Sequence, residues 1–385
     1  MEHLLNQRVQ DIQISGIRRF FNMVSQYSDA ISLTIGQPDF TTPEHIKTAA
    51  KTAIDQNKTV YTQNAGIHEL RNAASEFVLS KYGLSYNPED EIITTIGASE
   101  AIDIALRTIL VEGCEVILPG PVYPGYEPLI KLCGAIPVHI DTTETGFKLS
   151  AKQIEQAMTE KTRCIILPYP SNPTGRTLDE RTINDIATLL KDKEIFVLSD
   201  EIYSELIYDG SHYSIASNPI LREKTIVING LSKSHSMTGW RIGFTFAPSY
   251  ITKQMLKVHQ YIATCATSIS QYAALEALTV GINDAELMKH EYNKRRDYVY
   301  NRLISMGLDV VKPEGAFYLF PSIKKFNIRS FDFCTRLLDE ARVAVVPGDA
   351  FSQYGEGYVR ISYAYGMDVL EQGLNRFEAF IEKLV

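Results

Sequence analysis

The stretch Asn229-Gly-Leu-Ser-Lys-Ser-His-Ser-Met-Thr-Gly-Trp-Arg-Ile-Gly243 is the most informative part of the 385-residue sequence, and it follows an apolar run that predicts a buried strand. A lysine amine can form a Schiff base with an aldehyde, and hydroxyl groups and an arginine can hold a phosphate dianion. Ser232, Lys233 and Arg241 supply these groups, and three glycines in the same stretch allow the backbone to turn tightly or to approach a ligand. The spacing therefore favours a site for a phosphate-bearing aldehyde over a surface loop with an incidental lysine.

Short apolar runs alternate with segments of helical periodicity in the part of the sequence before Phe246. The runs that we expect to be buried strands are Glu115–Leu118, Cys164–Leu167, Ile195–Ser199, Thr225–Ile228 and Ile242–Phe246. The helical patterns are His68–Lys81, Glu100–Leu110, Ser150–Met158 and Leu178–Lys191. This alternation predicts an α/β domain around a mostly parallel sheet, with functional sites at the carboxyl ends of the strands.

The second half of the sequence predicts a different organisation. We expect two long helical stretches between Ile251 and Met306, with a break near Gly281–Asn283. The remainder mixes short strands, such as Asp309–Val311, with helices, which indicates a smaller α+β domain. Because a chain of this length has room for two cores, we expect residues 42–285 to form the large domain, and residues 286–385 to form the small domain together with the N-terminal residues 1–41.

Composition argues against several classes of function. The formal net charge is −8 and no extended basic run occurs, so we expect no nucleic-acid partner. The five cysteines lack paired short spacings and the eight histidines are dispersed, which predicts free thiols and no metal site. The N-terminus lacks the unbroken apolar segment of a secretory signal, and no apolar run approaches the ~20 residues needed to cross a bilayer. These observations predict a cytoplasmic protein without a membrane partner.

The run around Lys233 resembles that of the fold-type I, class I/II aminotransferases, and the resemblance covers nearly the whole chain. It implies the fold of that family, which is α/β with a large domain around a mostly parallel seven-stranded sheet and a smaller α+β domain. It also implies that pyridoxal 5'-phosphate (PLP) is the cofactor, bound through Lys233, with its phosphate held by Ser232 and Arg241. Many relatives have a third hydroxyl group where this chain has Gly230, so we expect phosphate binding to depend more on Ser232, Arg241 and the loop at Ala98–Ser99.

Polar side chains near the ends of two further strands resemble catalytic residues of the family. Asp200 ends a predicted strand, so it should emerge at the carboxyl edge of the sheet, where a carboxylate can pair with the pyridine nitrogen and keep it protonated. The alternative is that Asp200 only caps the next helix. Tyr203 is similar to the tyrosine that bonds the phenolic oxygen of the cofactor. Asn172, in the predicted turn Tyr169–Gly175, is similar to the asparagine that bonds this oxygen and the substrate carboxylate.

Two further motifs resemble those that hold the phosphate and the ring of the cofactor in this family. Gly97, Ala98 and Ser99 precede a helical pattern, and backbone N–H groups at the start of a helix can bind a phosphate. Ser99 can also be an ordinary N-cap, and the two interpretations are compatible. Tyr123 is similar to the aromatic residue that stacks on the pyridine ring, and a core tyrosine is the alternative.

Three residues are implied to act on the substrate or between subunits. Arg360 lies inside an apolar strand pattern, where an unpaired guanidinium is costly, so it needs a carboxylate. The resemblance implies the α-carboxylate of the substrate, and a fixed internal salt bridge is the alternative. Gly36 resembles the residue that lines the substrate carboxylate through its backbone. Tyr61 resembles the tyrosine that reaches the phosphate in the neighbouring subunit, which implies a homodimer with shared active sites.

The implied reaction moves an amino group from an amino acid to a 2-oxo acid such as 2-oxoglutarate, and Lys233 moves the proton at the substrate. Met1–Asn6, Ser32–Phe40 and Leu231–Arg241 most resemble the branch of the family that uses N-acetyl-L,L-diaminopimelate in bacterial lysine biosynthesis. Arg18 and Arg19 are candidates for the distal carboxylate of that substrate, with exposed helix arginines as the alternative. An aromatic or broad-specificity aminotransferase and a PLP-dependent cystathionine-type β-lyase are the alternative enzymes. A transcriptional regulator would need an additional basic DNA-binding domain.

Overall fold

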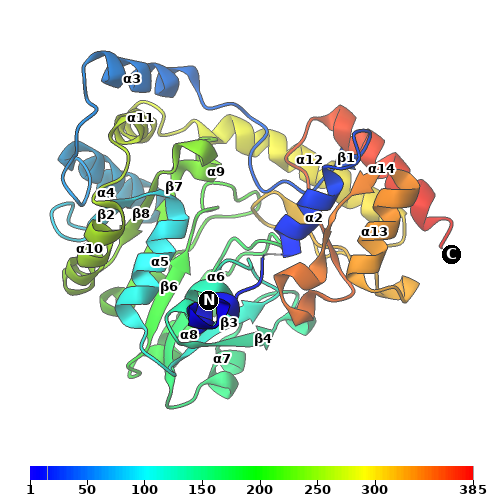
Figure 1. Cartoon of the computed structure of the whole chain (residues 1–385), viewed down its shortest axis with the longest axis horizontal. Helices are drawn as coiled ribbons and strands as arrows, with labels where there is room; N and C mark the ends of the chain where they lie inside the picture. Colours follow the sequence, from blue (N-terminus) through cyan, green and yellow to red (C-terminus); the bar gives the residue numbers. More distant parts are fainter. Residues whose placement is uncertain (15, 385) are drawn as a thin grey trace.

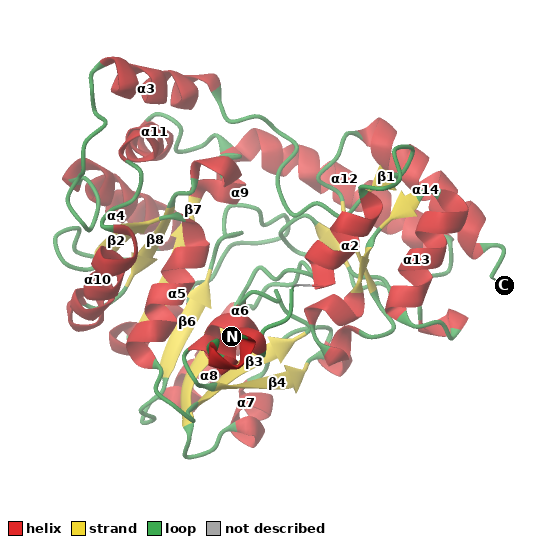
Figure 2. Cartoon of the chain, in the orientation of Figure 1, coloured by secondary structure: helices red, strands yellow, loops and turns green. Residues whose placement is uncertain are grey.

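The computed structural model describes residues 1–14 and 16–384, and a seven-stranded sheet lies at the centre of its larger part (Figure 1, Figure 2). The strand order is β2 (Ile92–Thr95), β8 (Gly243–Phe246), β7 (Thr225–Gly230), β6 (Phe196–Asp200), β5 (Thr162–Leu167), β3 (Glu115–Gly120) and β4 (Ile136–Asp141). β8 is antiparallel to both of its neighbours, and the other neighbouring pairs are parallel. The predicted α/β fold with a mostly parallel seven-stranded sheet is confirmed.

Alternation of side chains along the central strands explains why helices cover both faces of the sheet. In β5, Cys164 and Ile166 belong to one apolar core, and Ile165 and Leu167 belong to another. Successive side chains of a strand point to opposite faces, so a strand buried on both faces is apolar at every position. The first core is closed by α5 (Gly97–Ile109), α6 (Tyr126–Leu132) and α10 (Ser249–Ala263), and the second by α7 (Ala151–Ala157) and α8 (Glu180–Leu190). At the β2 end of the sheet, α3 (Glu44–Asp55), α4 (His68–Tyr82) and α11 (Ser268–Thr279) cover the second face.

The sequence did not predict every element. β4 was missed because Ile140 is its single buried side chain and it contains Pro137, so it lacks an apolar run. The expected pair of long helices is wrong, since three helices follow β8: α10, α11 and α12 (Ala285–Ser305). The additional break comes at Thr264, which has a left-handed φ of 64° and whose carbonyl accepts a hydrogen bond from Asn64 Nδ2 at 2.7 Å. No glycine or proline marks this break in the sequence.

The smaller part of the chain contains a three-stranded antiparallel sheet in the order β11 (Val346–Pro347), β12 (Val359–Ser362), β9 (Tyr318–Leu319). Its helices are α12, α13 (Ser330–Ala341) and α14 (Met367–Ile381), which share one apolar core with β9 and β12 (Figure 1). The segment Asp309–Val311 is not a strand.

Two N-terminal segments lie on different parts of the molecule. β1 (Ile31–Ser32) pairs in parallel with β10 (Val343–Ala344), and α2 (Gly16–Val24) contacts β11. By contrast, α1 (Gln7–Gln10) contacts α6, and Arg8 forms an ion pair with Glu112 in the loop before β3. The division at residues 41/42 and 285/286 stays a prediction. In the described ranges, none of the helices is long and apolar enough to cross a membrane.

Candidate functional site

A cavity of about 620 Å³ lies between the carboxyl ends of β5, β6 and β7 and the strand β12. The expected site residues that line it are Gly36, Ala98, Ser99, Tyr123, Asn172, Asp200, Tyr203, Ser232, Lys233, Arg241 and Arg360. Gly97 lies beside it, since a Cβ on this residue would be 2.6 Å from Arg241 Nη2. Tyr61 does not line the cavity, and its side chain is exposed. The fold therefore brings together all but Tyr61 of the residues expected to hold the cofactor and the α-carboxylate.

Lys233 lies in the short helix α9 (Leu231–Ser234), which begins directly after β7. Its Nζ donates a hydrogen bond to the carbonyl oxygen of Gly36 at 2.5 Å. Burial lowers the pKa of Lys233 to about 8, and the positive charges of Arg360 and Arg241 act in the same direction. A large fraction of its amine is therefore neutral near pH 8, and a neutral amine can attack an aldehyde or accept a proton.

Asp200 is the last residue of β6 and is buried. Its carboxylate accepts hydrogen bonds from the Tyr126 hydroxyl at 2.6 Å and from the Ile202 N–H at 3.2 Å. Burial raises the pKa of Asp200 to about 6, and these two hydrogen bonds oppose that rise. The residues that follow, 201–210, contain turns and no helix, so Asp200 has no helix to cap there.

A chain of polar contacts connects the two sides of the cavity. The Tyr203 hydroxyl lies 2.8 Å from the Tyr318 hydroxyl, and the ring centroid of Tyr318 lies 4.4 Å from the Arg360 guanidinium carbon. Arg360 donates from Nη1 to Asn172 Oδ1 at 2.9 Å and from Nη2 to the carbonyl oxygen of Thr34 at 2.5 Å. Burial raises the pKa of Tyr203 well above its usual value, so its hydroxyl stays protonated and can donate.

Arg360 is 2% exposed, yet the described residues supply no counter-charge for it. Across residues 1–14 and 16–384, none of the carboxylates lies within 4.0 Å of its guanidinium nitrogens, and its Nε is buried without a hydrogen-bond partner. The alternative of a fixed internal salt bridge is therefore wrong for the described residues. Because burying an unpaired guanidinium is costly, Arg360 is suited to bind an anion that enters the cavity.

A second anion-binding region lies at the start of α5. Gly243 in β8 packs so closely on this turn that a Cβ there would lie 2.6 Å from the backbone nitrogen of Ala98. Ser232 and Arg241 line the cavity here, and Arg241 Nη1 donates to the carbonyl oxygen of Thr238 at 3.0 Å. A helix start, a hydroxyl group and a guanidinium together favour a phosphate group.

Several cavity residues were not selected from the sequence. Tyr126 could have been found, since it ends the same motif as Tyr123, but Tyr318 lies inside an apolar run that reads as core. Ile17 and Phe21 of α2 also line the cavity. The side chains of Arg18 and Arg19 lie outside the described part of the structure. In the part that is described, histidines, cysteines and carboxylates form no group of three or more that could hold a metal ion.

The fold and the cavity are those of a PLP-dependent aminotransferase, and the chain belongs to the class I and II aminotransferases, whose family model matches residues 28–377. Enzymes of this family act on amino acids and 2-oxo acids and are typically dimeric. A protein of Bacillus subtilis (strain 168) named probable N-acetyl-LL-diaminopimelate aminotransferase is 64% identical over 383 residues, which cover 100% of this chain and 97% of that protein.

Two solved structures support the same assignment. The aromatic aminotransferase from Pyrococcus horikoshii OT3 is 44% identical, with a TM-score of 0.91 over 95% of this chain and 100% of that one. The aspartate aminotransferase from Thermus thermophilus with maleate is 35% identical, with a TM-score of 0.93 over 99% of both chains.

Proposed function

We propose that this aminotransferase moves an amino group between N-acetyl-L,L-diaminopimelate and 2-oxoglutarate, using PLP bound in the cavity around Lys233. The observation that carries the binding mode is Arg360, a buried guanidinium beside Asn172 with an unpartnered Nε. An α-carboxylate is present in both proposed substrates and would supply the missing charge. The choice of donor is supported by the 64% identity, over the whole chain, to the Bacillus subtilis protein with that name.

The residues around the cavity fit PLP group by group. Lys233 would bind the aldehyde, Asp200 the pyridine nitrogen, and Tyr203 and Asn172 the phenolic oxygen. The phosphate would be held by Ser232, Arg241 and the helix start at Gly97, Ala98 and Ser99, with Tyr123 against the ring. When bound, PLP supplies an electron sink for cleavage of a bond at the substrate α-carbon. Borohydride reduction followed by peptide mapping should place a pyridoxyl label on Lys233, and a label on another lysine would contradict this assignment.

The side chains of the protein bind and orient the substrate, and one of them moves a proton. Arg360 and Asn172 orient the α-carboxylate, which fixes the α-carbon relative to Lys233. Lys233 can take the proton from that carbon and return it elsewhere, because its pKa of about 8 lies close to neutral pH. Asp200, with a pKa of about 6, is mostly ionised at pH 7 and can stabilise a protonated ring nitrogen.

The distal end of the donor would extend toward α2 and the start of α5. Ile17 and Phe21 present apolar surface there, which suits a methylene chain and an acetyl group. Relatives that prefer short dicarboxylates can have a lysine at the position of Ser99. The serine in this chain supports a longer substrate.

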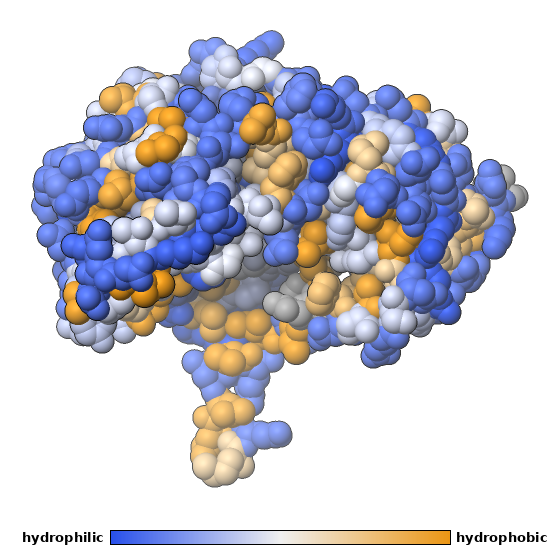
Figure 3. Space-filling view, turned by 90° about the horizontal axis from the view of Figure 1, so that it is seen from above, coloured by the Kyte–Doolittle hydropathy of each residue, from blue (hydrophilic) through white to orange (hydrophobic). Residues whose placement is uncertain are grey.

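Shared active sites in a homodimer are the second part of the proposal. Tyr61 and Val60 are 83% and 74% exposed, and Arg241 is also exposed at the rim of the cavity. The N-terminal segment projects from the body of the molecule (Figure 3). It carries the exposed apolar residues Leu4, Leu5 and Val9, and a second subunit would cover such surface. Mixing inactive Lys233→Ala subunits with inactive Tyr61 variants should restore some activity, because one site of the heterodimer is then intact. No recovery after demonstrated subunit exchange would contradict a shared site.

The substrate is tested by kcat/KM for N-acetyl-L,L-diaminopimelate, aspartate, phenylalanine and tyrosine, with 2-oxoglutarate as acceptor. We expect the acetylated donor to be preferred. An aromatic aminotransferase is the second candidate, because the 44% identical Pyrococcus enzyme has that name. If phenylalanine or aspartate is used equally well, the lysine-pathway assignment fails while the aminotransferase assignment survives. A stoichiometric need for an amino acceptor would exclude a β-lyase.

A further inference from the structure

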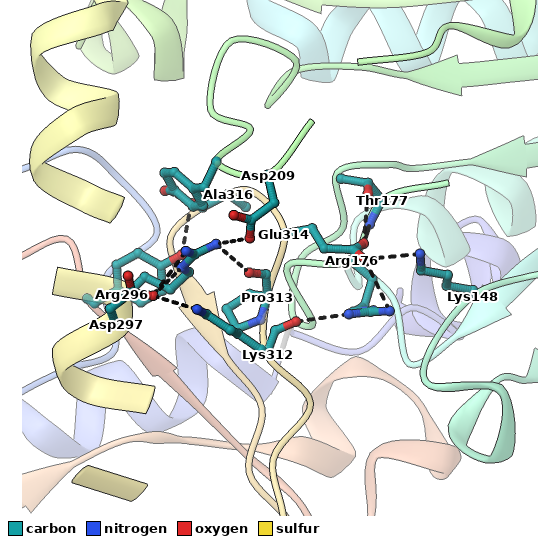
Figure 4. Close-up of polar contacts among 12 residues, drawn as sticks. Lys148, Arg176, Thr177, Asp209, Arg296, Asp297, Lys312, Pro313, Glu314 and Ala316 are labelled. Atoms are coloured by element: carbon teal, nitrogen blue, oxygen red, sulfur yellow. Dashed lines mark hydrogen bonds and ion pairs between the residues drawn. The ribbon is translucent and has the colours of Figure 1, made fainter. Parts of the chain in front are cut away.

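A cluster of paired charges joins the loop before β9 to the loop after β5 (Figure 4). The centre of this cluster is Glu314. Its Oε1 accepts a hydrogen bond from Lys148 Nζ at 3.1 Å and lies 3.3 Å from Arg176 Nη2. Its Oε2 accepts from the Thr177 N–H at 3.0 Å and from the Thr177 hydroxyl at 2.7 Å. Burial alone would raise the pKa of Glu314, but the Thr177 hydrogen bonds and the two cations hold it below its usual value, so the carboxylate is ionised at neutral pH.

The backbone of the same loop is tied to the larger part of the chain. The N–H groups of Glu314 and Gly315 both donate to the carbonyl oxygen of Gly175 at 2.8 Å, and the Ala316 N–H donates to that of Leu206 at 2.9 Å. Gly175 has a φ of 66°, and a Cβ on it would lie 2.4 Å from Pro313 Cβ. The two loops therefore pack with no space for a side chain at this position.

Arg296 of α12 extends the cluster to a third loop. It donates to Asp209 Oδ2 at 2.5 Å and to the carbonyl oxygen of Pro313 at 3.1 Å. Asp297 lies 3.0 Å from Arg296 Nη2 and 2.9 Å from Lys312 Nζ. Figure 4 shows Arg296 and Asp297 on one side of Lys312 and Pro313, and Arg176 and Lys148 on the other side. The loop before β9 is thus held by charge pairs as well as by backbone hydrogen bonds.

The cluster is connected through the backbone to both residues proposed to bind the substrate carboxylate, which themselves contact each other at 2.9 Å. On one side, the turn that contains Asn172 is closed by hydrogen bonds from Ser171 N–H to Arg176 O at 2.9 Å and from Gly175 N–H to Ser171 O at 2.8 Å. On the other side, the Glu314 loop continues into β9, which pairs with β12, the strand that carries Arg360. Glu314 therefore connects the turn that contains Asn172 to the loop beside the strand that carries Arg360. Binding of a carboxylate by both residues depends on their relative position.

We propose that Glu314 is a positioning residue that holds the Asn172 turn at the correct place relative to Arg360, so that both can bind an α-carboxylate. This inference rests on the proposed binding roles of Asn172 and Arg360. It requires no contact between Glu314 and the substrate, since Glu314 acts through Arg176 and Thr177. A small displacement of Asn172 relative to Arg360 is sufficient to weaken binding of a carboxylate that contacts both residues.

The test is Glu314→Gln in the holoenzyme, which removes the charge facing Lys148 and Arg176 but keeps an oxygen for Thr177. We expect the Kd for glutarate, an unreactive analogue of 2-oxoglutarate, to rise about tenfold in calorimetry, and the KM for 2-oxoglutarate to rise similarly. The change in kcat and in the Kd for PLP should stay within about twofold, because Lys233, Asp200, Ser232 and Arg241 would hold the cofactor independently of the Asn172 turn. Thr177→Val, which retains the charge, should raise the same Kd by a smaller factor.

Glu91→Gln is the matched control. The Glu91 side chain is 17% exposed against 25% for Glu314, and it accepts from Arg222 at 2.9 Å and from the Asn87 N–H at 2.8 Å. It lies outside the cavity lining, so glutarate binding should be unchanged in this variant. An unchanged glutarate Kd in Glu314→Gln, or an equal rise in Glu91→Gln, would overturn the inference. Arg360→Lys separates the two proposals: if it weakens glutarate binding while Glu314→Gln does not, only the positioning role fails, and if it has no effect, the proposed carboxylate site fails.

Discussion

Two arginines of this chain, Arg296 and Arg360, are each 2% exposed, but their surroundings differ. Arg296 faces the carboxylates of Asp209 and Asp297 and a backbone carbonyl. Within the described part of the chain, Arg360 has only neutral acceptors, the carbonyl oxygens of Asn172 and Thr34. A buried cation that the chain itself neutralises holds segments together, whereas one that the chain leaves without a counter-charge is available for a ligand. The role of each arginine therefore depends on whether a carboxylate of the chain lies beside it, and not on the residue type or its burial.

The same distinction separates the two regions in which these arginines lie. In the cavity, Asp200 and Lys233 also lack ion-pair partners among the described residues, and their pKa values move toward neutrality, to about 6 and about 8. In the Glu314 cluster, each charged side chain faces an opposite charge. A buried ionisable side chain without an ion-pair partner can exchange protons near pH 7, whereas one in an ion pair stabilises the fold.

The largest expected effect is that of Arg360→Leu. We expect kcat/KM to fall about a thousandfold, because a desolvated carboxylate loses its charged partner. The free energy of unfolding should change little or increase, because an unpaired buried charge is replaced by an apolar side chain. Steady-state kinetics and urea unfolding measure the two quantities. A stable variant with normal kcat/KM would show that Arg360 binds no substrate.

Arg296→Leu should have the opposite profile. The free energy of unfolding should fall by about 3 kcal/mol, since the Pro313 carbonyl and two carboxylates lose their donor. Asp209 and Asp297 are both partly exposed, which limits the loss through solvent screening. The kcat/KM of the folded protein should fall less than that of Arg360→Leu. A larger fall would place Arg296 in the binding machinery and remove the contrast between the two arginines.

The pH dependence of apoprotein stability tests the unpaired state of Asp200. Its pKa is about 6 in the folded protein against an ordinary value of 3.8, so the folded state keeps a proton that the unfolded chain has lost within this window. Asp200 therefore makes the protein lose about 2 kcal/mol of stability as the pH rises from about 4 to about 6. Asp200→Asn should flatten the dependence in urea unfolding across that range. An identical slope in both proteins would mean that Asp200 is compensated in the folded state.

The smallest expected effect is that of Tyr126→Phe. The Tyr126 hydroxyl donates to the Asp200 carboxylate and so lowers the pKa of that group. Its removal should shift the acid limb of the kcat/KM profile upward by about one pH unit. Tyr169→Phe is a control, because this buried tyrosine bonds the backbone of Phe147 and Leu149 instead. Equal shifts in both variants would contradict a specific role for Tyr126.

The sequence by itself determined the five central strands of the sheet and the location of the chemistry. Apolar runs predicted five central strands, and Asn172, Asp200 and Lys233 follow or end three of these strands, β5, β6 and β7. Because parallel strands place their carboxyl ends at one edge, residues at those ends meet without further information. The run around Lys233 also identified the family, because its spacing is local.

Only the tertiary structure decided which buried charges are paired. Tyr126 bonds Asp200 across 74 positions, Tyr318 meets Tyr203 across 115, and Arg360 meets Asn172 across 188. No sequence motif singles out Glu314, and its four contacts come from segments that are distant along the chain. Periodicity reports whether a side chain is buried, but the partner of a buried charge comes from another segment. The difference between Arg296 and Arg360 therefore exists only in the folded molecule.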